Sequence, residues 1–124
     1  MLALRNPREA YRRVDLDARI EGASPSQLVR LCFDQAEMSL AGALFAHRCG
    51  DNQGKSQAIT KALAALTALQ MGVNGEAGVA GALRQFYGAT RRTLLDCAVD
   101  CDEGTVAAIR QDLTEIASAL ASTN

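Results

Sequence analysis

The feature that most constrains the fold is a helix start followed by a long segment without proline. Ser24 is a strong N-cap, Pro25 suits the first helical position, and Gln27 completes a capping box with Ser24. The chain then continues for about six helical turns without another proline or a cluster of turn residues. This pattern predicts a helix over 25–49, about 36 Å long at 1.5 Å per residue.

Three further helices are predicted from apolar residues that recur at spacings of three and four. They cover 55–71, 76–99 and 103–121. Clusters of Gly, Asp and Asn over 50–54 and of Asp, Glu and Gly over 100–104 separate these segments. No strand pattern and no internal repeat is present in the sequence. Short links between successive helices favour antiparallel neighbours.

The chain has 124 residues, enough for one domain around one core. We predict an all-α fold, an antiparallel four-helix bundle over 23–121. An N-terminal arm or short extra helix over 1–22 precedes it, and a polar tail over 122–124 follows. Tyr11 in the arm is either a surface ring or a plug in a groove that a partner would otherwise fill.

Composition excludes several classes of function. With 13 Lys and Arg against 14 Asp and Glu, the net charge is −1, whereas a nucleic-acid binder usually carries a basic excess. The first residues lack the apolar core of a signal peptide. No apolar run approaches the ~18 residues that a transmembrane helix needs, so we expect no membrane insertion.

Four cysteines stand at positions 32, 49, 97 and 101, and none forms a C-x-x-C pair. Cys97 and Cys101 are four residues apart, but no histidine or second cysteine pair lies near them in the sequence. We therefore expect no metal and no cofactor. The cysteines are interpreted as reduced thiols of a cytosolic protein, most of them in the core.

The sequence carries no pattern typical of an enzyme. It lacks a Gly-rich phosphate loop, a nucleophile elbow and a paired-histidine metal motif. The one alternative is a phosphotransfer bundle that would use His47, which Arg48 follows. His47 falls in the last turn of its predicted helix, where a histidine commonly interacts with the terminal carbonyls and the helix dipole.

The order of motifs resembles the flagellar export chaperone family known as FliS. Residues 10–11 (AY), a polar spacer and residues 23–29 (ASPSQLV) are similar to the opening of that family. Residues 31–36 (LCFDQA) resemble its next segment, and residues 83–87 (LRQFY) resemble part of its third helix. The resemblance covers about 10–121, nearly the whole chain.

This resemblance implies a cytosolic, non-enzymatic chaperone of the bacterial flagellum. Members bind the disordered C-terminal segment of flagellin, prevent premature polymerisation and keep the subunit competent for type III export. The client folds partly into helices in surface grooves, and the N-terminal segment can cover part of that site. Other flagellar export components are possible further partners. A helical adaptor for another secretion or flagellar protein remains an alternative function.

The candidate partner-binding residues are apolar side chains of the second and third predicted helices, together with the aromatic ring of the arm. They are Tyr11, Ile59, Leu63, Leu66, Leu83, Tyr87 and Leu94. Each of these side chains can instead pack in the core. We expect Tyr87 to be the exception, because a tyrosine ring can cover apolar surface while its hydroxyl stays in contact with water. Gly81 and Gly88 are either tolerated in the helix or form a shallow notch that receives another helix.

Overall fold

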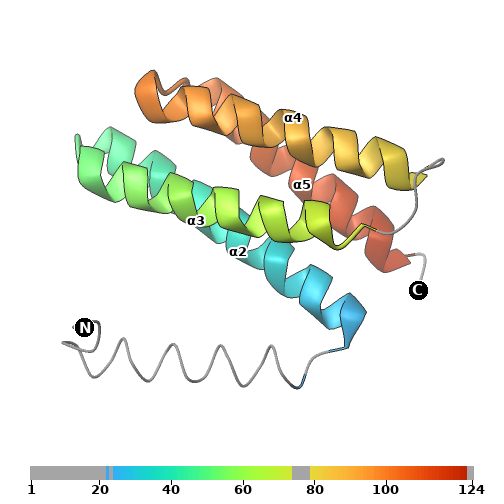
Figure 1. The fold of residues 1–124 in the computed structure, drawn as a ribbon. Helices are drawn as coiled ribbons and strands as arrows, with labels where there is room; N and C mark the ends of the chain where they lie inside the picture. The colour runs from blue at the N-terminus through green and yellow to red at the C-terminus, as the bar shows by residue number, and fades with distance from the viewer. Residues whose placement is uncertain (1–21, 23, 74–78, 123–124) are drawn as a thin grey trace, which may run out of the picture.

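The computed structural model describes residues 22, 24–73 and 79–122. These residues form four antiparallel α-helices, as the sequence predicts (Figure 1). They are α2 (Pro25–Arg48), α3 (Asn52–Met71), α4 (Val79–Val99) and α5 (Glu103–Ser122). None of these helices is long and apolar enough to cross a membrane.

The capping box at the start of α2 is confirmed. The Gln27 N–H donates to the Ser24 hydroxyl at 3.3 Å, and the Ser24 N–H donates to the Gln27 side-chain oxygen at 2.8 Å. Pro25 occupies the first helical position. Because these contacts satisfy N–H groups that have no partner within the helix, they fix where α2 begins.

The turn between α2 and α3 is shorter than the sequence predicts. Gly50 has a φ of 71°, a left-handed conformation that favours glycine. The Asp51 side chain then accepts a hydrogen bond from the Gly54 N–H at 2.9 Å and caps α3. Since Asp51 is the N-cap, α3 begins at Asn52, and the predicted start at residue 55 is wrong.

At the other described helix boundaries the structure differs from the prediction by at most about one residue. The Asp102 carboxylate accepts hydrogen bonds from the Gly104 N–H and the Thr105 hydroxyl, next to the start of α5. Ser122, assigned to the polar tail, is the last residue of α5. The predicted start of α4 at residue 76 lies outside the described residues.

The bundle encloses one core, in which α3 lies against both α2 and α4, and α2 also lies against α5. By contrast, α4 and α5 are close at few positions. Small residues such as Ala36 and Ala62, both fully buried, allow α2 and α3 to approach closely. The largest fully buried side chains are Tyr87, Phe33, Leu40, Ile59, Leu66, Leu94, Leu113 and Val106.

Candidate functional site

An apolar groove lies at the end of the bundle where α2 and α4 begin and where α3 and α5 end. Its volume is about 710 Å³. All four helices contribute side chains to its lining. In Figure 1 this is the end at which α4 and α5 stand apart, whereas the short turn before α5 joins them at the other end. The groove therefore forms where α4 and α5 do not pack against each other.

The floor of the groove is aromatic. Phe33 and Tyr87 both line it, and each is only 2% exposed. Their ring centroids are 6.2 Å apart, and Tyr87 packs edge-on against Phe86 as well, at 5.8 Å. Burial, with a smaller effect of the Cys32 thiol, raises the pKa of Tyr87 to about 12. The floor is therefore uncharged at neutral pH and consists of apolar rings that are almost fully buried.

The walls of the groove are aliphatic and its rim is polar. Val29 from α2, Leu83 from α4 and Leu120 from α5 supply the walls. Val79, at the start of α4, lines the groove and is 71% exposed, so an apolar side chain there is open to a partner. Arg30 and other polar side chains of α2 and α5 complete the lining. A concave apolar surface with few polar groups suits the apolar face of a helical peptide.

The structure places only two of the candidate residues in this groove, Leu83 and Tyr87. Ile59, Leu66 and Leu94 are fully buried in the core, and Leu63 is half-buried against it. Tyr87 is not the expected exception to packing, because its ring belongs to the core even though one part of it lines the groove. Tyr11 lies outside the described residues.

Most of the groove was missed by sequence reasoning, which concentrated on the second and third helices. Val29, Phe33 and Leu120 line it but belong to α2 and α5. The apolar spacing of 76–99 alone would place Val79 in the buried seam of its helix, yet this side chain is exposed. The positions of these residues near helix ends could have indicated the groove, because the ends of antiparallel helices meet in space.

His47 lies in the last turn of α2, as predicted. Its Nε2 is 4.0 Å from one carboxylate oxygen of Glu103, and the other oxygen accepts a hydrogen bond from Arg48 at 3.0 Å. A phosphoryl group on His47 would face the negative charge of Glu103, so this geometry does not favour phosphotransfer. Among the described residues, no three His, Cys, Asp or Glu side chains could hold a metal ion together.

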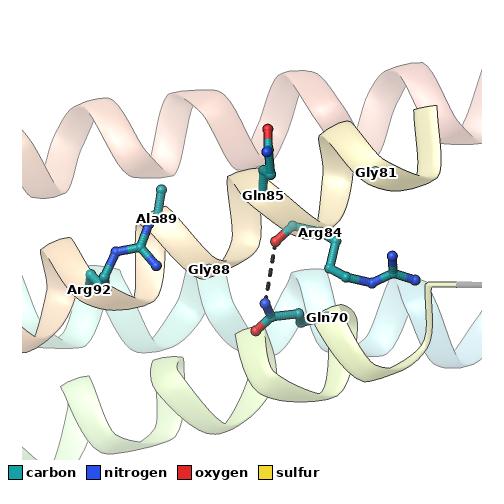
Figure 2. Close-up of a pocket in the computed structure, with 7 residues that line it drawn as sticks. All are labelled: Gln70, Gly81, Arg84, Gln85, Gly88, Ala89 and Arg92. Atoms are coloured by element: carbon teal, nitrogen blue, oxygen red, sulfur yellow. Dashed lines mark hydrogen bonds between the residues drawn. The ribbon is translucent and has the colours of Figure 1, made fainter. Parts of the chain in front are cut away.

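A second, shallower hollow lies between α3 and the outer side of α4, with a volume of about 650 Å³. Gly81 and Gly88 both line it, so these glycines do mark a depression. Figure 2 shows Gln70 reaching from α3 toward α4, where its amide donates to the Arg84 carbonyl at 3.4 Å. Arg92 also lines the hollow. This hollow is more polar than the apolar groove.

Comparison with known proteins identifies the family. A model of the family described as flagellar protein FliS matches residues 7–123. The chain belongs to the FliS family. A relative from Salmonella typhimurium strain LT2, named flagellar secretion chaperone FliS, is 30% identical to it over 114 residues, which cover 90% of this chain and 84% of the relative.

Membership of the FliS family confirms the resemblance predicted from the sequence. The match includes all four described helices and most of the preceding arm, so the whole bundle belongs to one family unit. The name of the Salmonella relative describes a secretion chaperone of the flagellum. The apolar groove lies within the residues that the family model matches.

Proposed function

We propose that this flagellar secretion chaperone binds the disordered C-terminal segment of flagellin in its apolar groove. Binding would occur in the bacterial cytosol, prevent premature polymerisation and keep the subunit competent for type III export. The observation that carries this proposal is the groove itself, which has aliphatic walls and an aromatic floor and lies where α4 and α5 are apart. Its shape and chemistry are those of helix-in-groove recognition.

The energetics of such binding require several apolar anchors. Ordering a disordered segment costs about 2–5 kcal/mol of the gross interaction energy. Full burial of one leucine-sized side chain contributes about 1.5–3 kcal/mol, so two or three anchors can offset the ordering cost. The groove has room for that number, since helices contribute apolar walls on several sides.

The candidate residues take two roles in this proposal. Leu83 and Tyr87 contact the client, because both line the groove. Ile59, Leu66 and Leu94 support the site from within the core, since each is 2% exposed or less. For Leu63, half-buried on α3, we propose the same supporting role.

Calorimetric titration with the C-terminal ~40–50 residues of flagellin from the same organism tests the proposal. A segment of this length can bury the ~1,000–3,000 Å² that is typical of coupled folding. We expect one-to-one binding with a clearly negative heat-capacity change, because apolar surface is buried and the client folds. Val79→Gln should weaken binding, since it places an amide where the groove offers an exposed apolar side chain.

The matched control is Val99→Gln at the other end of the same helix. Val99 is 90% exposed and does not line the groove. Both substitutions change exposed positions, so the stability of the bundle should change by less than about 0.5 kcal/mol. Equal binding by the two variants would place the client elsewhere. Absence of binding to a folded chain would leave an adaptor for another secretion or flagellar protein.

For the N-terminal arm we propose that Tyr11 covers part of the groove when no client is bound. Deleting residues 1–22 should then tighten client binding. The affinity should rise by a factor of one divided by the fraction of full-length molecules in which the groove is uncovered. Ser24, which caps α2, is retained in this deletion. Titration of the full and shortened chains with the same flagellin segment measures the effect. Weaker binding after deletion would mean that the arm holds the client.

A further inference from the structure

The outer face of α4 is a second surface of interest, and it points away from the groove. Gly81, Gly88 and Leu95 are spaced by seven residues and therefore lie along one side of the helix. Leu95 is 53% exposed and Val99, one turn further, is 90% exposed. Tyr87, by contrast, points into the core. The outer face thus begins with a hollow and ends with two exposed aliphatic side chains.

The hollow forms because no side chain projects from α4 at its two glycines. Gln70 occupies part of the space over Gly88, since a Cβ at Gly88 would lie 3.1 Å from the Gln70 amide nitrogen. Contact with Gln70 therefore leaves little room for a side chain at position 88 unless Gln70 shifts. It does not explain the exposure of Leu95 and Val99, which no described helix covers. The stripe is therefore open to a partner at Leu95 and Val99, and only partly at the glycines.

The charge around the hollow is positive. Arg92 is exposed and lines the hollow, where the described lining residues include no Asp or Glu. Arg91 donates to the Gln70 side-chain oxygen at a long 3.4 Å, and its Nε is buried with no acceptor in the described part of the chain. In the whole of α4 the sequence has three arginines and one acid, Asp96, which is exposed and lies one turn beyond Arg92.

We propose that the outer face of α4 docks an amphipathic helix of a partner protein, in which small and apolar residues form a seam flanked by Asp and Glu. The seam would lie over the glycine hollow and against Leu95 and Val99. The flanking carboxylates would face Arg91 and Arg92, and complementary charge of this kind selects the partner and its orientation. This surface is distinct from the client groove, which lies on the inner side of α4.

A pair of fluorescent helical peptides tests the proposal on the full-length chain. Each has about 20 residues, roughly the length of α4, with Ala and Leu along one face. One peptide carries Glu on both flanks of that face and the other carries Lys. We expect saturable binding of the Glu peptide by fluorescence anisotropy, with at least tenfold weaker binding of the Lys peptide.

Substitutions on the chaperone locate the site. Arg92→Glu and Val99→Gln should each weaken binding of the Glu peptide, the first by about tenfold, because it reverses a charge at the hollow. Arg110→Glu, at an exposed position on α5, and Val79→Gln in the groove are the controls and should leave it unchanged. Circular dichroism confirms folding, and Arg92→Gln replaces Arg92→Glu if the latter does not fold.

The outcomes are separable from those of the client experiment. Val79→Gln should affect only flagellin binding and Arg92→Glu only the acidic helix, and the flagellin segment should not displace the Glu peptide. Absence of saturable Glu-peptide binding, equal binding of the two peptides, or indifference to Arg92→Glu would overturn the proposal. Displacement by the flagellin segment would also overturn it, since the face would then belong to the client site.

Discussion

Replacement of Tyr87 by alanine is expected to lower the free energy of unfolding by about 3–5 kcal/mol, as for other large aromatic side chains removed from a core. Tyr87 is 2% exposed and packs edge-on against both Phe33 and Phe86, so its removal leaves a cavity beneath the groove. Urea unfolding followed by circular dichroism measures the change. A loss of this size is a large fraction of the stability of a small domain.

Tyr87→Phe separates the ring from the hydroxyl. Within the described part of the chain the Tyr87 hydroxyl has no hydrogen-bond partner, so the phenylalanine variant should change stability by less than about 1 kcal/mol. If Tyr87→Ala were as mild as Tyr87→Phe, the packing role of the ring would be wrong. Weaker flagellin binding by Tyr87→Phe, with unchanged stability, would instead show that the hydroxyl contacts the client.

Leu83→Asp is expected to weaken flagellin binding by about 100-fold or more. A carboxylate on the groove wall would be covered by an apolar client segment without a partner, a cost of about 3 kcal/mol, and each 1.4 kcal/mol is a factor of ten. Leu83 lines the groove directly beside its aromatic floor. Calorimetry with the flagellin segment measures the affinity, and circular dichroism checks that the bundle stays folded.

Leu95→Asp is the matched control for this substitution. It places the same charge on the same helix, at a side chain that is 53% exposed and does not line the groove. Client binding by Leu95→Asp should equal that of the unchanged chain. If the two aspartate variants bound flagellin equally well, the groove would not be the client site, whatever the family membership implies.

Helix positions could be predicted from the sequence because capping is local chemistry. Ser24 and Gln27 meet across one helical turn, so the start of α2 was visible in four consecutive residues. The start of α3 was missed because Asn52 and Gly54 resemble turn residues, although Asp51 caps the helix ahead of them. Errors of this size do not alter the four-helix architecture.

The groove could not be predicted in the same way, because it depends on distances between helices. Leu66 and Leu83 have the same side chain and lie in similar seams, yet one is fully buried and the other lines the groove. The difference arises because α4 and α5 are close at few positions, a tertiary property that periodicity along the chain does not encode. Met38 is a parallel case, because this large apolar side chain of α2 is 70% exposed.

The sparse contact between α4 and α5 also divides the molecule into parts of unequal local stability. The α2–α3 hairpin is the most extensively packed pair, so its backbone amides should open to solvent only in global unfolding. The ends of α4 and α5 beside the groove have fewer neighbours and belong to the regions that open at lower free energy. A client bound there would supply the missing packing. The unfolding of the chaperone would therefore become more cooperative when the client is bound.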